Sequence, residues 1–145
     1  MSLQYCHFIV AADPATGRSR ILFTETDSAW VDVDDDLTWV NDGREFVWSS
    51  ERDGFNHLYL HDRNGRLLRQ VTRGAWDVTA FHGLSADGRW LYFSAAEQGP
   101  LERHLYRIRL DGSDMERLTR EPGTHNVSMA PGGMHYIDVH STAAE

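Results

Sequence analysis

Short runs of apolar, aromatic and β-branched residues alternate with polar turns through the middle of the chain. Three turn sequences, Asn41-Asp42-Gly43, Asp53-Gly54 and Asn64-Gly65, separate runs at positions 37–40, 46–49, 57–60 and 67–72. Glycine tolerates a positive φ, and the preceding Asn or Asp side chain closes a local turn, so each sequence predicts a hairpin. The runs are rich in strand-forming residues. Together they predict four antiparallel strands in a meander.

The same pattern returns further along the chain. Asp42-Gly43 is matched by Asp87-Gly88 after 45 residues, and His57-Leu58-Tyr59 is matched by His104-Leu105-Tyr106 after 47 residues. A third, partial copy begins at Gly132-Gly133. A period near 45 residues with four strands in each unit is typical of β-propeller blades. The alternative, unrelated hairpins in a β-sandwich, is disfavoured by the common order of the matched positions.

The flanking segments predict incomplete blades. Residues 7–26 match the two outer strands of a blade, and residues 125–139 match the first two strands of another. The chain is therefore predicted to be all-β, with two full four-stranded antiparallel blades and two half blades, and no helix. Residues 1–145 are interpreted as a single domain. The predicted strands after the first full blade are 78–85, 91–95, 103–109, 115–120, 125–129 and 134–139.

Composition and charge narrow the possible partners. The formal net charge is −8, which argues against a nucleic-acid partner, because phosphate binding needs a cationic surface. No apolar run approaches the length of about 20 residues that a membrane span requires. Cys6 is the single cysteine, so an internal disulfide is impossible. An inert strand cysteine is the default interpretation of Cys6.

Two stretches resemble the propeller domain of the dipeptidyl peptidase IV branch of the prolyl oligopeptidase family of serine peptidases. One is Phe46-x-Trp48-Ser49-Ser50-Glu51-x-x-Gly54-Phe55-x-His57-Leu58-Tyr59. The other is the link Val71-Thr72-x-Gly74-x-Trp76-Asp77-Val78-Thr79, which is more diagnostic because generic propellers lack it. The resemblance extends from about residue 8 to residue 139.

The resemblance implies a larger parent protein, in which an eight-bladed propeller caps an α/β-hydrolase domain that carries the catalytic Ser, Asp and His. The nucleophile of that domain lies in a G-x-S-x-G elbow, and a Glu-Glu pair in an earlier part of the propeller binds the α-amine of the substrate. Neither sequence occurs in this chain. We therefore predict a fragment of the N-terminal propeller without the hydrolase domain, with no catalytic residue and no cofactor.

The implied role of the segment is architectural. It would form the wall and entry of the active-site cavity in a peptidase that releases N-terminal dipeptides with Pro or Ala second. The expected partners are the rest of the propeller, the hydrolase domain and, through the parent, a peptide substrate. The family also suggests a periplasmic or secreted parent. Open strand edges predict self-association of the fragment itself.

The linker after Trp30-Val31 supplies the candidate site residues. In animal relatives this linker carries an aromatic residue and an Arg that border the substrate site, and the corresponding positions here are about Asp34 and Asp35. Both are candidates for the substrate cavity, although acids stand where the relatives carry an aromatic residue and an Arg. The run of acids also mimics the start of an EF-hand loop, but Leu37 and Gly43 stand where Gly and Glu are needed. A solvated acidic linker without a metal is predicted.

The histidines show no metal-binding spacing such as H-E-x-x-H. His57 and His104 occupy equivalent blade positions, which indicates a structural role. A different class of function stays open, because the strand repeat is also that of TolB-like periplasmic propellers, which are protein-binding modules. A stand-alone protein of about three blades is a further alternative, which the unpaired strand edges disfavour.

Overall fold

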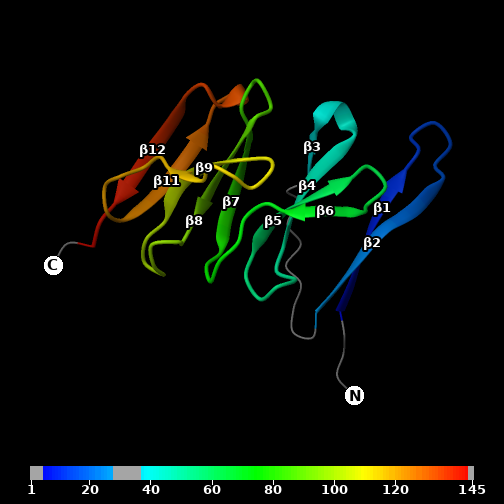
Figure 1. Ribbon diagram of the computed structural model, residues 1–145, viewed down its shortest axis with the longest axis horizontal. Helices are drawn as coiled ribbons and strands as arrows, with labels where there is room; N and C mark the ends of the chain where they lie inside the picture. Colours follow the sequence, from blue (N-terminus) through cyan, green and yellow to red (C-terminus); the bar gives the residue numbers. More distant parts are fainter. Residues whose placement is uncertain (1–4, 28–36, 144–145) are drawn as a thin grey trace, which may run out of the picture.

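The computed structural model describes residues 5–27 and 37–143, which form four antiparallel sheets in a row (Figure 1). We number these sheets blades 1 to 4 in chain order. Blade 1 consists of β1 (Tyr5–Ala12) and β2 (Ser19–Asp27). Blade 2 consists of β3 (Thr38–Val40), β4 (Glu45–Ser50), β5 (His57–Asp62) and β6 (Leu67–Gln70). Blade 3 consists of β7 (Val78–Leu84), β8 (Trp90–Ala95), β9 (His104–Arg109) and β10 (Glu116–Arg117). Blade 4 consists of β11 (Thr124–Met129) and β12 (Tyr136–Ser141).

Within each blade, every strand pairs with its neighbours in sequence, so blades 2 and 3 are four-stranded meanders and blades 1 and 4 are hairpins. The two complete blades share one register, since Trp48 lies opposite Tyr59 in blade 2 and Phe93 lies opposite Tyr106 in blade 3. The predicted all-β fold, with two full and two half propeller blades, is confirmed.

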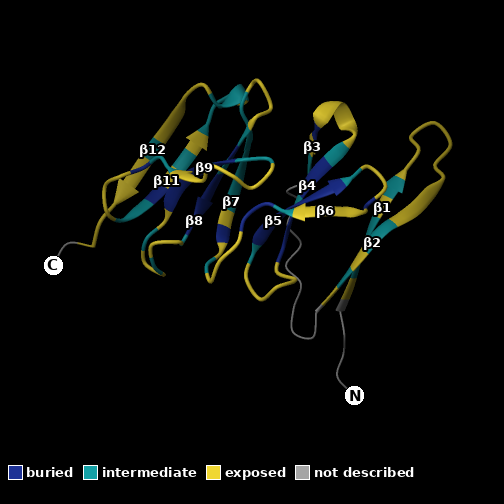
Figure 2. Cartoon of the chain, in the orientation of Figure 1, coloured by how far each residue is buried: buried dark blue, intermediate teal, exposed yellow. Residues whose placement is uncertain are grey.

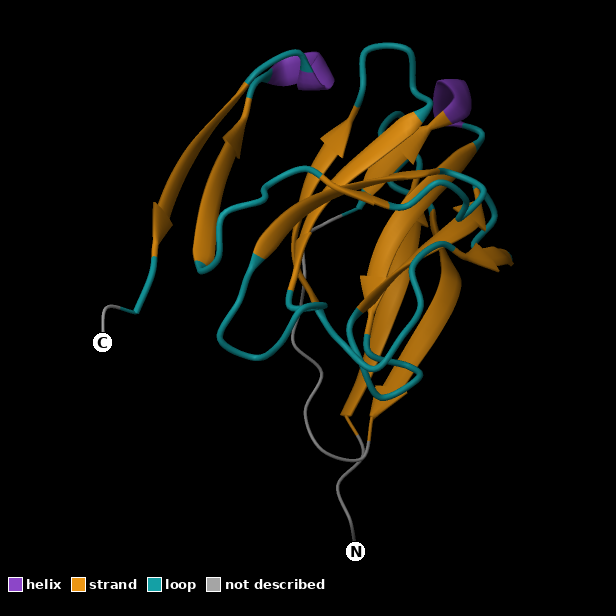
Figure 3. Ribbon diagram, turned by 60° about the vertical axis from the view of Figure 1, so that its left-hand side comes forward, coloured by secondary structure: helices purple, strands orange, loops and turns teal. Residues whose placement is uncertain are grey.

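The turns and strand ends differ in detail from the prediction. The turns before β4 and β12 are wound as short 3₁₀ segments, η1 (Asn41–Gly43) and η2 (Pro131–Gly133), drawn as purple coils in Figure 3. Residues 130–135 close the second turn through a hydrogen bond from the Ala130 N–H to the His135 carbonyl, 2.8 Å. As a result β12 begins at Tyr136, two residues later than predicted. Within the described residues, no helix is long and apolar enough to cross a membrane.

The core lies in the central strands of blades 2 and 3, which Figure 2 shows in dark blue. Aromatic rings join neighbouring blades. Phe23 of blade 1 stacks on His61 of blade 2, with ring centroids 4.6 Å apart, and Trp76 stacks on Phe93 of blade 3 at 6.3 Å. These rings fill the space between neighbouring blades.

A backbone hydrogen bond fixes the start of blade 3, and an equivalent bond the start of blade 4, to a loop of the preceding blade. The Val78 N–H, at the start of β7, donates to the Asn56 carbonyl, 2.8 Å. The His125 N–H, at the start of β11, donates to the Arg103 carbonyl, also 2.8 Å. Asn56 and Arg103 each precede the third strand of a full blade, so the two bonds are equivalent. We call this bond the interblade clamp.

Candidate functional site

The two residues that the sequence favours for a substrate cavity, Asp34 and Asp35, lie outside the described residues. Their role stays a prediction. The described part of the chain instead brings its polar side chains together at the blade ends, where a histidine meets the link to the next blade.

In blade 2 this histidine is His57, which is fully buried. Its Nε2 lies 2.9 Å from the Gly74 carbonyl and its Nδ1 lies 3.0 Å from Thr72 Oγ1. The same hydroxyl oxygen accepts a hydrogen bond from the Leu58 N–H, 3.0 Å. A neutral imidazole with its proton on Nε2 satisfies every partner, because the Thr72 hydroxyl then donates to Nδ1.

Blade 3 repeats this unit with His104, Thr119 and Leu105. His104 Nδ1 lies 3.0 Å from Thr119 Oγ1, which also accepts from the Leu105 N–H at 3.0 Å. Here Nε2 donates to the carboxylate of Glu102, 2.8 Å. The repetition of the contacts agrees with the structural role predicted for His57 and His104.

Replacing Thr119 by valine is expected to lower the free energy of unfolding by about 1–3 kcal/mol, because a buried N–H and a buried ring nitrogen both lose their partner. Valine keeps the shape of the side chain. Thr79→Val, at an exposed position of β7, is the control and should change stability by less than about 0.5 kcal/mol. Urea denaturation measures both variants. Equal stabilities for the two would contradict the assignment of the Thr119 hydroxyl as a structural partner.

Blade 4 carries a third histidine with a different charge state. His125 Nδ1 lies 2.6 Å from Asp138 Oδ2, and its Nε2 lies 2.7 Å from the Glu121 carbonyl. Both partners only accept hydrogen bonds, so both ring nitrogens must carry protons and the ring is an imidazolium. Burial lowers the pKa of His125, but the bonds to Glu121 and Asp138 outweigh burial and raise it overall. Sequence spacing gives no sign of this pair, which strand pairing brings together.

His61 is a buried histidine at the contact of blades 1 and 2, and its pKa is shifted in the opposite direction to that of His125. Its Nδ1 donates to the Gly65 carbonyl, 3.0 Å, and its Nε2 faces the Arg52 guanidinium, 3.4 Å. Burial is the main effect and lowers the pKa of His61. The hydrogen bond to the Gly65 carbonyl opposes it, the positive charge of Arg52 adds to it, and the pKa is lowered overall. The ring is therefore neutral and accepts from Arg52.

The lowered pKa of His61 predicts a pH-dependent contribution to stability. The unfolded chain takes up a proton on this residue near pH 6.5, whereas the folded chain does so only at lower pH. Stability from the neutral ring is thus complete above about pH 6.5 and falls as the pH drops toward the folded pKa. His61→Phe keeps the aromatic stack, and its deficit relative to the wild type should narrow between pH 7.5 and 5.5. Chemical denaturation at both pH values tests this, and a constant or widening deficit would contradict it.

One pair in blade 3 has the atoms of a nucleophile and a base. His82 Nε2 lies 2.7 Å from Ser94 Oγ. Ser94 is only 3% exposed, within a central strand, and no acidic partner for the His82 ring occurs among the described residues. Burial lowers the pKa of His82. Ser94 is closed off from substrate, and the described residues supply no orienting acid, so the pair lacks the geometry of an activated nucleophile.

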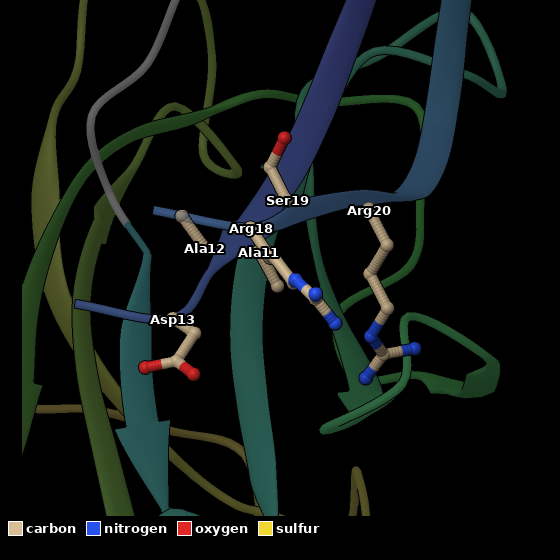
Figure 4. Close-up of a pocket in the computed structure, with 6 residues that line it drawn as sticks. All are labelled: Ala11, Ala12, Asp13, Arg18, Ser19 and Arg20. Atoms are coloured by element: carbon tan, nitrogen blue, oxygen red, sulfur yellow. The ribbon is translucent and has the colours of Figure 1, made fainter. Parts of the chain in front are cut away.

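A shallow hollow of about 370 Å³ lies at the tip of the β1–β2 hairpin (Figure 4). Its charged side chains do not converge, since the Asp13 carboxylate lies apart from the guanidinium groups of Arg18 and Arg20. Asp13 bonds the Ala15 N–H and the Thr16 hydroxyl of its own turn, which lower its pKa. Asp13 thus serves its own turn, and Arg20 donates to the Asn64 side-chain oxygen of blade 2, 2.8 Å, so the charged groups form no binding constellation. The lining residues are Ala11, Ala12, Asp13, Arg18, Ser19 and Arg20.

Comparison with known proteins assigns the chain to a family of propeller proteins, in agreement with its blade architecture. The family described as the dipeptidyl peptidase IV (DPP IV) N-terminal region matches residues 3–144. The chain belongs to this family. A crystal structure of dipeptidyl peptidase 4 from Porphyromonas gingivalis superposes with a TM-score of 0.78 and 29% identity, covering 92% of this chain and 19% of that one.

Fungal relatives in the DPP IV family give the same result. A probable dipeptidyl-aminopeptidase B of Emericella nidulans is 32% identical over 120 residues, which is 75% of this chain and 13% of the relative. A dipeptidyl peptidase 4 of Arthroderma otae is 30% identical over 100 residues, or 68% of this chain and 13% of the relative. The chain therefore spans less than a fifth of the length of these proteins.

The link motif that carries the resemblance to the DPP IV family has a physical explanation. Thr72 and Gly74 bind His57, as described above. Trp76 stacks on Phe93 and makes a T-shaped contact with His57, with ring centroids 4.8 Å apart. The Asp77 carboxylate accepts from the Asn56 N–H, 2.7 Å. Trp76 thus joins blade 2 to blade 3, while Thr72, Gly74 and Asp77 hold the link against blade 2.

Proposed function

We propose that this chain is a non-catalytic propeller segment of a serine dipeptidyl peptidase, where it forms part of the wall and entry of the active-site cavity. The family match over residues 3–144 carries the proposal. The absence of a G-x-S-x-G elbow from the sequence supports a non-catalytic role for residues 1–145, acting as one domain of a larger peptidase. The parent enzyme releases N-terminal dipeptides with Pro or Ala second, and its hydrolase domain is the partner of the propeller.

The two outer faces of the structure support a place within a longer row of blades. Ile21 of blade 1 is 58% exposed, and Ile137 and Val139 of blade 4 are 70% and 65% exposed. Figure 2 shows these outer blades largely in the colour of exposed residues, unlike blades 2 and 3. Apolar side chains of this size gain by burial against a neighbouring sheet. Further blades cover them in the parent, and the chain on its own self-associates through them, which light scattering at increasing concentration measures.

Asp34 and Asp35 border the substrate cavity in this proposal. Their double replacement by asparagine in the full-length enzyme should change KM for a peptide substrate while leaving kcat nearly unchanged, because the linker contacts substrate away from the reacting bond. An unchanged KM removes the two acids from the cavity without affecting the assignment of the segment.

The deciding experiment is release of a chromophore from a Gly-Pro-linked anilide, by this chain and by the full-length product of its gene. We expect activity in the full-length protein alone, with loss of that activity after a serine-directed inhibitor. The N-acetylated anilide is the matched control, since it lacks the free α-amine and should not be cleaved. No activity in either protein would support the TolB-like binding module instead. Activity in this chain alone would overturn the non-catalytic role.

A further inference from the structure

Two histidines and an aspartate meet on one face of the blade 4 hairpin. His125 on β11 lies directly opposite His140 on β12, with ring centroids 5.0 Å apart. Asp138 precedes His140 by two residues, so the alternation of a strand places it on the same face. One nitrogen of each histidine and one carboxylate oxygen of Asp138 all lie within 4.8 Å of one another.

These three groups are suitable ligands for one class of ion. Two imidazole nitrogens and a carboxylate oxygen suit divalent ions of borderline softness, above all Zn²⁺, and suit Mg²⁺ or Ca²⁺ poorly. Three protein ligands leave a fourth position of a tetrahedral ion for water. We propose that His125, Asp138 and His140 form a binding site for a Zn²⁺-like transition-metal ion.

The surroundings of His125 already orient the ring as a ligand. Its Nε2 is held by the Glu121 carbonyl at 2.7 Å, which leaves Nδ1 directed at Asp138. A histidine that binds a metal through one nitrogen commonly donates its other N–H to a backbone carbonyl in this way. The ion replaces the Nδ1 proton, which passes to solvent. The contact between Nδ1 and Asp138 Oδ2 then opens from 2.6 Å to about 3.3 Å, the spacing of two ligands on a tetrahedral Zn²⁺.

Asp138 provides a second, independent observation. Its Oδ1 atom is shielded from solvent and accepts no hydrogen bond from any described residue. A buried carboxylate oxygen without a partner is unfavourable, and an adjacent cation satisfies it.

The ligands can adjust to the ion without unfolding the blade. The side chain of Asp138 is 22% exposed, and His140 is exposed on β12. His125 alone is fixed in the interior, 2% exposed. The site thus combines one rigid ligand with two adjustable ones. Spacing in the sequence did not reveal it, since 13 and 15 residues separate His125 from the other two and only hairpin pairing brings them together.

The test is titration of the chelator-treated chain with ZnCl₂ by calorimetry, and with CoCl₂ by visible absorption, which reports tetrahedral coordination. The wild type should bind one ion per chain and show a raised Tm with Zn²⁺. His140→Ala and Asp138→Asn should each weaken binding at least tenfold. His140→Ala removes an exposed side chain, so its Tm in metal-free buffer should equal that of the wild type.

Two controls separate this site from other ligands on the chain. His135→Ala removes an exposed histidine of the same hairpin, and Cys6→Ser removes the exposed thiol. Neither should change the affinity. The proposal is overturned if the wild type does not bind Zn²⁺ saturably, or if either control weakens binding as much as His140→Ala. The result is independent of peptidase activity, because binding is measured on this chain alone.

Discussion

Replacing Phe93 by alanine is expected to lower the free energy of unfolding by about 3–5 kcal/mol, because the ring is lost from a fully packed interface. Phe93 is completely buried and stacks on Trp76 at 6.3 Å and on Tyr106 at 5.6 Å. The void left behind lies between Trp76 of the link and Tyr106 of blade 3, so it weakens the packing of the link that joins the two complete blades. Since a domain of this size has a total stability of about 5–15 kcal/mol, this loss is a large fraction of it.

Urea denaturation followed by tryptophan fluorescence measures the effect of Phe93→Ala. Leu101→Ala is the control, since Leu101 lies in a loop and is 86% exposed. The control should differ from the wild type by less than about 0.5 kcal/mol. A loss of under about 1 kcal/mol for Phe93→Ala would mean that blades 2 and 3 are not held together by this aromatic stack.

Replacing Gly65 by alanine is expected to separate blade 1 from blade 2. Gly65 lies in the β5–β6 turn at φ +88°, and a Cβ atom there would lie 2.6 Å from the Leu22 carbonyl oxygen on β2. Alanine is therefore strained twice, by about 1–2 kcal/mol for the left-handed backbone and by about 1–3 kcal/mol for the collision with a packed backbone. The collision acts on the neighbouring blade, so exchange of the β1 and β2 amides should accelerate at least tenfold.

Gly17→Ala separates the two causes of the Gly65 effect. Gly17 lies in the β1–β2 turn at φ +71°, and its added Cβ would meet no atom within 4 Å. It should therefore show the backbone strain alone, without detachment of blade 1. Hydrogen–deuterium exchange of residues 5–27 distinguishes the variants. Equal exchange in both would show that the close approach of Gly65 to Leu22 does not hold the blades together.

The repeated pattern of turns and strands predicted most of the fold from local physics. Asp42-Gly43 and Asp87-Gly88 identify equivalent hairpins, and Gly43 and Gly88 have similar φ values of +75° and +69°. Strand ends were predicted less well, because β10 covers Glu116–Arg117 rather than 115–120 and β12 begins at Tyr136 rather than 134. Thr119 ends the pairing by turning its hydroxyl to His104, a contact between distant residues that strand propensity does not encode.

The polar site was less predictable than the fold. His57 and His104 could be interpreted correctly, because the repeat shows that they are equivalent. The charge of His125 could not be predicted, since it depends on the Glu121 carbonyl and the Asp138 carboxylate. These partners approach the ring only after β11 and β12 pair. When the protonation state of a side chain depends on contacts across strands, only the folded hairpin shows which state it has.

The interblade clamp explains how such a chain diverges during evolution. The bond is made by backbone atoms, so it persists although Asn56 and Val78 in one copy are replaced by Arg103 and His125 in the other. The two additional residues of the second copy fall in the loop at 96–103, before the clamp, where an insertion does not shift the next blade. Substitution and small insertions can therefore accumulate within a blade while the spacing of blades is inherited unchanged. A structure with only 29% identity accordingly still superposes with a TM-score of 0.78.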